Sequence, residues 1–264
     1  MPERWRLIVD APLDGATNMA RDEALATVLA HDPARPTLRL YAWQPACLSL
    51  GRFQRSREAD QAACARAGVT IVRRPSGGRA LLHDHELTYA VIAPERHPQL
   101  GDESILASYR QISLALLAGL HQLGVVAELT PVARQRAAAS SAACFDAPAS
   151  YELTVGGRKL AGSAQTRQGG VILQHGAIPL TPHADRLAAL LLHPPSGLGQ
   201  KMIALSQAAG RAVTFDELAQ ALITGFGTAW GIELEPGTPT PAELALEQQL
   251  RARRYALAEW TFGR

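Results

Sequence analysis

The sequence predicts an α/β protein with a mixed β-sheet flanked by helices. Three observations support this fold class. Short alternating apolar segments recur between segments with helical periodicity, several strands are joined by turns too short for a crossover helix, and 47% of the 264 residues are hydrophobic. Hairpin-like connections are not typical of a doubly wound nucleotide-binding fold. We therefore expect one sheet with parallel and antiparallel strands.

The first half of the chain predicts helices and strands around a glycine loop. Helices are expected at residues 17–30 and 58–67, where apolar residues recur at helical spacing. Thr17 or Asn18 is the candidate cap of the first helix, and Gly68 ends the second. Strands, which alternate or are rich in β-branched residues, are expected at residues 5–9, 37–43, 47–51, 69–72 and 86–93.

The second half predicts a hairpin and more helix. Gly156-Gly157 joins strands expected at residues 151–155 and 158–163, which is a strong hairpin signal. Residues 134–143 are rich in Ala and Ser and predict a mobile connection. The other elements, strands first and then helices, are expected at residues 125–129 and 171–180, and at 103–122, 184–192, 214–230 and 242–258.

Composition bears on compartment and partners. A formal net charge of +2 does not imply nucleic-acid binding, and no apolar run reaches the roughly 18 residues of a membrane span. The N-terminus lacks the apolar stretch of a secretion signal. Cys47, Cys64 and Cys144 are odd in number and widely spaced, which argues against a disulfide framework. We expect a cytoplasmic protein that binds neither nucleic acid nor membranes.

Arginine is concentrated in one segment. Residues 51–80 contain seven arginines against only Glu58 and Asp60. Two interpretations stay open: a solvated surface, or a docking surface for an acidic partner or a phosphate-bearing substrate.

The residues Arg-Arg-Pro-Ser-Gly-Gly-Arg at 73–79 are the most informative segment. Consecutive glycines take positive φ at little steric cost, and their N–H groups can form a concave nest for an anionic or carbonyl oxygen. The segment lacks the Gly-Lys-Ser/Thr ending of a P-loop and the spaced glycines of a dinucleotide fold. It predicts a ligand-binding loop of unassigned chemistry.

Cys144 is the candidate nucleophile. It stands in a turn of small residues before Pro148, whereas Cys47 and Cys64 fall in an expected strand and helix. A free cysteine is most often a buried small hydrophobe, and that interpretation suits Cys47 and Cys64 better.

Lys159 is the candidate partner of this thiol. A lysine just after a hairpin turn is ordinarily exposed and inert, but Lys159 precedes a Gly-Ser-Ala-Gln stretch at 162–165 that is free of bulk. If Lys159 points into one cavity with Cys144, its charge favours the thiolate, and burial lowers its own pKa so that it can shuttle a proton.

The histidines are ambiguous. For His175, beside Gly176, a buried core histidine with its hydrogen bonds satisfied is a slightly better interpretation than a catalytic one. The same two interpretations stay open for His83 and His85, which follow the glycine loop. No spacing of His, Cys and carboxylates predicts a metal site.

Together these segments resemble the lipoate–protein ligase and octanoyltransferase family. The resemblance covers nearly the whole chain and is carried, in order, by residues 18–23, 51–54, 73–80, 83–89, 159–165, 174–176 and 255–263. It implies the biotin/lipoyl-ligase fold, a mixed sheet flanked by helices. It also implies a single catalytic domain over residues 1–264 with no C-terminal accessory domain.

Two chemistries share this fold. Ligases activate a free acid with ATP, whereas octanoyltransferases take the acyl chain from acyl carrier protein through a cysteine thioester. Arg79 in place of a third glycine, Cys-Phe at 144–145 and Tyr-Glu at 151–152 resemble the transferase branch. The alternative is an ATP-dependent lipoate–protein ligase that acts through an acyl-adenylate, in which Cys144 is incidental. A third interpretation is a non-catalytic protein that binds acyl chains or carrier proteins.

The resemblance to the transferase branch also implies roles and partners. Octanoyl-acyl carrier protein is the expected donor, and a lipoyl-domain protein such as glycine-cleavage H protein is the expected acceptor. We expect a monomer. We also expect no cofactor, because exchange of one thioester for another needs no ATP. Cys144 and Lys159 are the implied catalytic residues. The implied substrate-binding residues are Arg74, Ser76, Gly77, Gly78, His83, Gly162, Ser163, Ala164, Gln165, His175 and Gly176. Backbone N–H groups of the two Gly-containing loops are candidates for an oxyanion hole.

Overall fold

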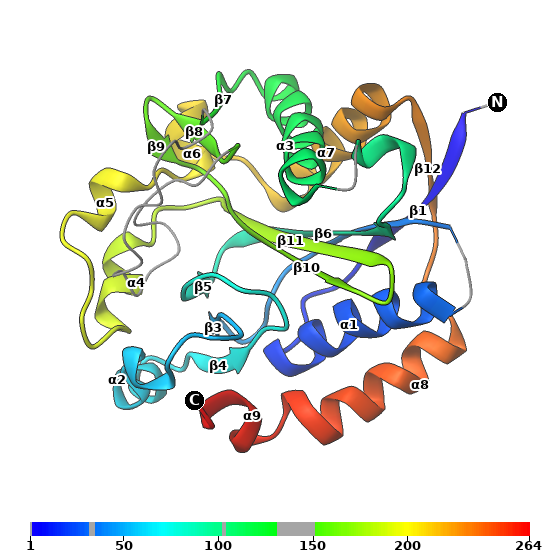
Figure 1. Cartoon of the computed structure of the whole chain (residues 1–264). Helices are drawn as coiled ribbons and strands as arrows, with labels where there is room; N and C mark the ends of the chain where they lie inside the picture. Colours follow the sequence, from blue (N-terminus) through cyan, green and yellow to red (C-terminus); the bar gives the residue numbers. More distant parts are fainter. Residues whose placement is uncertain (1, 32–34, 102–103, 131–150) are drawn as a thin grey trace.

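A six-stranded mixed sheet forms the centre of the protein (Figure 1). The computed structural model describes residues 2–31, 35–101, 104–130 and 151–264. In sheet order the strands are β10 (Gly162–Gln168), β11 (Val171–Pro179), β6 (Glu86–Pro94), β2 (Thr37–Tyr41), β1 (Glu3–Val9) and β12 (Ile232–Pro236). β1 pairs in parallel with β2 and β12, and the other three pairings are antiparallel. This arrangement confirms the predicted fold class.

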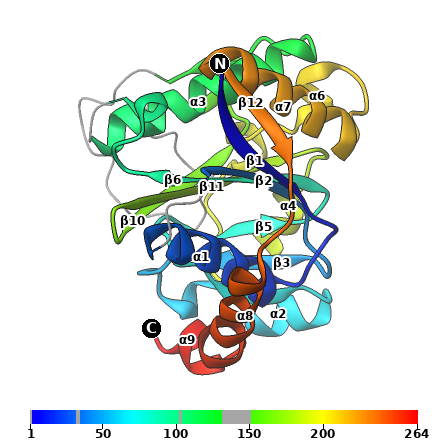
Figure 2. The same ribbon diagram turned by 90° about the vertical axis from the view of Figure 1, so that its right-hand side faces the viewer.

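Helices cover both faces of this sheet (Figures 1 and 2). On one face lie α3 (Ile105–Gln122) and α7 (Phe215–Trp230); on the other lies α1 (Gly15–His31), with α8 (Pro241–Leu250) packed outside it. Successive side chains of a strand point to opposite faces, so each strand feeds two cores. In β2, Leu38 and Leu40 join the core under α3 and α7, while Tyr41 joins the core under α1.

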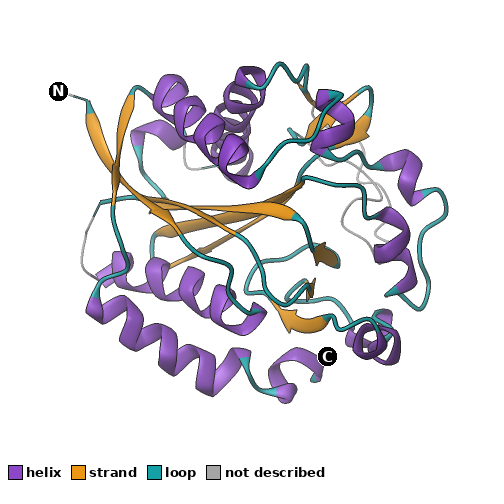
Figure 3. Cartoon of the chain, turned by 180° about the vertical axis from the view of Figure 1, so that it is seen from behind, coloured by secondary structure: helices purple, strands orange, loops and turns teal. Residues whose placement is uncertain are grey.

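Two three-stranded sheets flank the central one (Figure 3). The first comprises β3 (Cys47–Leu50), β4 (Thr70–Arg73) and β5 (Leu81–His83), and the second comprises β7 (Glu128–Leu129), β8 (Leu153–Val155) and β9 (Arg158–Lys159). The remaining elements are η1 (Ser56–Glu58), α2 (Gln61–Arg66), η2 (Pro98–Leu100), α4 (Ala184–Ala189), α5 (Leu198–Lys201), α6 (Leu205–Ala209), the π-helix η3 (Arg251–Tyr255) and α9 (Ala258–Phe262).

The predicted cap of the first helix is wrong. α1 begins at Gly15 because the Asp14 carboxylate accepts hydrogen bonds from the N–H and hydroxyl of Thr17, at 3.1 and 2.6 Å. Asn18 instead donates to the carbonyls of Leu13 and Ala42 and so ties the helix to the chain after β2.

Several predicted boundaries also differ. The strand expected at 158–163 is divided between β9 and β10, which belong to different sheets, although the Gly156-Gly157 hairpin itself is confirmed. The helix expected at 58–67 is η1 followed by α2, which starts where Asp60 accepts from the N–H of Ala63 at 2.8 Å. The helix expected at 242–258 ends at Leu250 and continues as η3 and α9. The strand expected at 125–129 is limited to β7, and residues 134–143 lie outside the described residues.

Within the part of the chain that the structure describes, no helix is both long and apolar enough to cross a lipid bilayer.

Candidate active site

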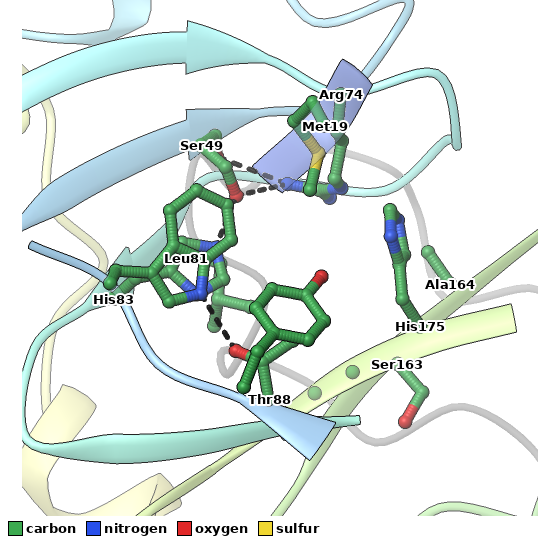
Figure 4. A pocket seen from close by; sticks show the side chains of 13 residues that line it. Met19, Ser49, Arg74, Leu81, His83, Thr88, Ser163, Ala164 and His175 are labelled. Carbon is green, nitrogen blue, oxygen red and sulfur yellow. Dashed lines mark hydrogen bonds between the residues drawn. The ribbon is translucent and has the colours of Figure 1, made fainter. Parts of the chain in front are cut away.

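A cavity lies between the central sheet and the small sheet of β3, β4 and β5 (Figure 4). It contains about 320 Å³ of empty space, its open mouth included. Among the described residues, seven that the sequence analysis assigned to the site line it: Arg74, His83, Gly162, Ser163, Ala164, His175 and Gly176. Six others that it did not assign complete the wall: Met19, Tyr41, Trp43, Ser49, Leu81 and Thr88. The cavity thus brings together segments far apart in sequence.

Gly176 lets three strands approach closely at the cavity floor. It pairs with Ser163 of β10 and Tyr89 of β6. A Cβ at this position would lie 2.5 Å from Ser163 Oγ, 2.7 Å from the Gly162 carbonyl oxygen and 2.8 Å from a ring carbon of Tyr89. Because the Tyr89 hydroxyl also donates to Ser163 Oγ at 2.7 Å, glycine leaves the space in which this bond forms.

A buried hydrogen-bond network through His175 joins Ser76 of the glycine loop to Asp22 of α1. His175 Nδ1 lies 2.9 Å from Asp22 Oδ2, and its Nε2 lies 2.5 Å from Ser76 Oγ. Asp22 also accepts from Arg39 at 2.6 Å and from the Tyr41 hydroxyl at 2.8 Å.

The charge states in this network follow from burial. Burial opposes ionisation of Asp22, but the Arg39 charge and the His175 hydrogen bond outweigh it and lower the pKa of Asp22. Burial lowers the pKa of His175, with the Asp22 hydrogen bond opposing it. A neutral His175 therefore donates a hydrogen bond from Nδ1 to the Asp22 carboxylate and accepts one at Nε2 from the Ser76 hydroxyl. Ser76 is fully buried, so in this arrangement it holds the loop and does not line the cavity.

Arg74 directs all five of its guanidinium N–H donors at the protein. Nη1 donates to the carbonyl and hydroxyl oxygens of Ser49 at 3.0 and 3.1 Å. Nε and Nη2 donate to the Gly77 carbonyl at 3.2 and 2.8 Å, and Nη2 also donates to the Arg79 carbonyl at 2.7 Å. Of the two loop glycines only Gly78 has positive φ, at 92°, and a Cβ there would lie 2.8 Å from Arg74 Nη2. The loop is therefore folded around Arg74.

His83 occupies a second polar chain on the opposite wall. Its Nε2 lies 2.8 Å from Ser49 Oγ and its Nδ1 lies 2.6 Å from Glu86 Oε1. The Trp43 ring stacks on the imidazole with centroids 3.8 Å apart, and donates from Nε1 to Thr88 Oγ1 at 2.8 Å. Since Ser49 also accepts from Arg74, His83 and Arg74 share a hydrogen-bond partner on β3.

Lys159 is buried and paired. Its Nζ donates to Glu152 Oε1 at 2.6 Å, and the two side chains are 2% and 4% exposed. Lys159 is not among the described lining residues; it stands at the end of β9, three positions before Gly162, which does line the cavity. Glu152, which the sequence analysis quoted without assigning a role, is the partner of Lys159 in this pair.

The three cysteines separate into two groups. Burial raises the pKa of Cys47 to about 12 and that of Cys64 to about 11, so neither forms a thiolate near neutral pH. Cys144 lies outside the described residues.

Other predicted site residues lie around the cavity. Gly77 is half-buried and Gly78 is exposed, and Gln165 bonds to Gln174 at 2.9 Å and to Ser108 at 3.1 Å. Neither the two glycines nor Gln165 is among the described lining residues.

The wall suits an apolar ligand. Met19, Tyr41, Trp43 and Leu81 present carbon surface to the cavity, and the polar groups between them already bond to one another. Apolar walls with a few placed polar groups are typical of small-molecule sites in general, and an acyl chain is one ligand that such a wall fits.

Comparison with known proteins defines the class of protein to which this fold and cavity belong: a catalytic domain of the acyl-ligase or acyltransferase kind. The family described as "Lipoyl protein ligase A/B catalytic domain" matches residues 14–227. The chain belongs to this family.

Individual relatives are similar over their whole length. The Octanoyltransferase LipM of Brevibacillus brevis is 42% identical over 276 aligned positions, covering 99% of this chain and 100% of the relative. That of Moorella thermoacetica is 43% identical, covering 98% and 97%. A crystal structure of lipoate-protein ligase A bound with ATP superimposes with a TM-score of 0.84 at 25% identity, covering 98% of this chain and 99% of that one.

Proposed function

We propose that this protein is an octanoyltransferase that moves an octanoyl group from octanoyl-acyl carrier protein to the lysine of a lipoyl domain. The observation that carries the proposal is the cavity: its carbon-lined wall suits an acyl chain, and its polar groups already bond to one another. The octanoyltransferases that match this chain end to end support the same activity.

The proposed reaction has two steps. The Cys144 thiolate attacks the donor thioester, a tetrahedral intermediate forms, and the carrier sulfur leaves as a thiol with a proton donated by Lys159, which is then neutral. The acceptor amine then attacks the enzyme thioester, forms the amide and releases Cys144. Lys159, held by Glu152, is proposed to stabilise the thiolate and to relay the proton of the incoming ammonium.

Cys144 is chosen for this role because the other two thiols are unsuited. Cys47 is fully buried and Cys64 nearly so, and the pKa of each is raised far above neutrality. A thiolate nucleophile needs the opposite environment.

The main alternative is the ATP-dependent lipoate ligase. Its chemistry needs cationic donors for phosphate, and the guanidinium of Arg74 is the obvious candidate beside the cavity. Among the described residues, its guanidinium donates to Ser49, Gly77 and Arg79 instead. This arrangement favours the transferase.

The test is incubation with octanoyl-acyl carrier protein without ATP, followed by intact-mass analysis. We expect the parent protein, Cys47→Ser and Cys64→Ser to gain one octanoyl group and to pass it to a lipoyl domain. Cys144→Ser should do neither. A parent protein that acylates a lipoyl domain only from free acid, ATP and magnesium would establish the ligase instead.

The remaining assignments belong to this proposal. The acceptor is a lipoyl-domain protein such as glycine-cleavage H protein, and the protein acts as a monomer in the cytoplasm, where its free Cys47 and Cys64 stay reduced.

A further inference from the structure

Two distant segments of the chain form an exposed surface beside the glycine loop. Phe53 is 70% exposed, an unusual state for a large aromatic side chain. The guanidinium carbons of Arg52 and Arg264 lie 5.8 and 5.4 Å from its ring centroid, and Arg55 is exposed nearby. We call Arg52, Phe53, Arg55 and Arg264 the arginine–phenylalanine patch.

A buried arginine braces this patch. Arg73, 1% exposed, donates from Nη1 to the carbonyls of Gly51 and Gln54 at 2.7 and 2.6 Å. Its Nη2 donates to the Thr261 carbonyl at 2.8 Å. A guanidinium removed from water thus ties the segment after β3 to α9, which lies beside β4 in Figure 1. Hydrogen bonds from Arg73 therefore fix the backbone on which the patch side chains stand.

The patch also carries uncompensated charge. Of the two carboxylates in the same segment, Glu58 accepts from Gln54 at 2.8 Å and lies 3.6 Å from Arg79, while Asp60 caps α2. Among the residues that the structure describes, no ion pair neutralises the three arginines of the patch. Grouped guanidinium groups around an aromatic ring favour an acidic partner that also carries phosphate.

The patch is continuous with the cavity wall. The backbone N–H of Arg52 donates to the Ser76 carbonyl at 2.8 Å, and a Cβ at Gly51 would lie 2.0 Å from the Gly78 carbonyl oxygen. Ser76 in turn bonds to His175, which lines the cavity. A partner on the patch therefore stands next to the loop that bounds the acyl site.

We infer that this patch docks the acyl donor, an acidic carrier protein whose acyl thioester hangs on a phosphodiester-linked arm. The inference rests on the proposed function. The donor presents a phosphodiester, which guanidinium groups attract. The acceptor presents a lysine ammonium in place of a phosphodiester, so the local chemistry of this surface matches the donor.

The experiment measures acylation of the enzyme from two donors: octanoyl-acyl carrier protein and the small thioester octanoyl-N-acetylcysteamine. Arg52→Glu, Arg55→Glu and Phe53→Ala are compared with the parent. Arg211→Glu is the control. Arg211 is an exposed arginine that pairs with Glu217 at 2.9 Å, and it lies between α6 and α7, which Figure 1 shows on the other side of the central sheet from α9. Circular dichroism confirms that each variant is folded.

We expect each charge reversal in the patch to lower kcat/KM for the carrier-bound substrate about tenfold at low ionic strength, with the difference shrinking as salt is added. Acylation from the small thioester should change less than twofold, and Arg211→Glu should match the parent with both donors. Equal losses with both donors, patch variants that behave like Arg211→Glu, or a defect confined to transfer onto the lipoyl domain would each overturn the inference. A parent protein that neither thioester acylates would overturn the proposed function, and the docking inference with it.

Discussion

Replacing Lys159 and Glu152 separately and together distinguishes a catalytic role of this pair from a purely structural one. The two charged groups are 2.6 Å apart and almost fully buried. At an effective dielectric constant of about 20, Coulomb's law gives an attraction of about 6 kcal/mol at that distance. Desolvation of each ion takes back several kcal/mol, so the pair as a whole contributes little.

The unfolding free energies should follow from this balance. Lys159→Met leaves the Glu152 carboxylate buried without its ammonium partner and should lower the free energy of unfolding by about 3–5 kcal/mol, as should Glu152→Leu. The double variant Glu152→Leu/Lys159→Met buries two apolar side chains and should return to within about 1 kcal/mol of the parent. Urea denaturation followed by circular dichroism measures all four proteins.

Transfer activity then separates the roles. If Lys159 handles protons in the reaction, the double variant should be as stable as the parent and still fail to acylate a lipoyl domain. A double variant that regains both stability and transfer would refute the catalytic role. If Lys159→Met lowers the free energy of unfolding by no more than about 1 kcal/mol, the account of the buried pair is refuted.

Three further predictions concern neighbouring features. Gly176→Ala should lower the free energy of unfolding by about 1–3 kcal/mol and impair acylation, because the added methyl group overlaps three atoms. Gly199→Ala, whose Cβ would have its nearest neighbour 3.7 Å away, should not destabilise the protein. Equal stability of the two variants in urea would contradict this prediction. Burial lowers the pKa of His175, so its contribution to stability is fully present above the unfolded-state pKa of about 6.5 and is lost as pH falls through the folded-state pKa. The free energy of unfolding of the parent should therefore fall on acidification more steeply than that of His175→Gln. Parallel curves between pH 7.5 and 5.5 would argue against a neutral imidazole. Cys47 and Cys64, with pKa values raised to about 12 and about 11, should resist iodoacetamide at pH 8 in the native protein, and peptide mapping that finds either labelled as fast as a free thiol would disprove their burial.

The fold class could be predicted because the period of the apolar pattern records local backbone geometry, even where both faces of a strand are buried, as in β2 and β6. Residues 37–43 and 86–93 alternate, and both form central strands of the sheet. Boundaries were less accessible, since neighbouring residues often compete for one role. Asp14, Thr17 and Asn18 all have capping side chains, and only the packing of α1 against the chain after β2 decides that Asp14 caps and Asn18 bridges.

The site was predictable in its segments but not in its contacts. Resemblance to a family located Arg74, His83 and His175, yet the partner of His175 through Nε2 is 99 residues away and the one through Nδ1 is 153 residues away. No local pattern encodes such a pairing. Met19 and Trp43 were not assigned to the site for a related reason: an apolar residue on a core-facing position looks the same whether it packs against protein or faces a cavity.

The arginine pair of the glycine loop shows what the fold adds to the sequence. Consecutive residues leaving a strand point in opposite directions. Arg73 therefore reaches toward Gly51 and Thr261 and supports the docking surface, while Arg74 reaches toward Ser49 and supports the cavity wall. Both donate chiefly to backbone carbonyls, so each fixes the position of chain and leaves no carboxylate to mark it in the sequence. One short segment thereby links the surface proposed to receive the donor with the cavity proposed to receive its acyl chain, and displacing the loop should disturb both.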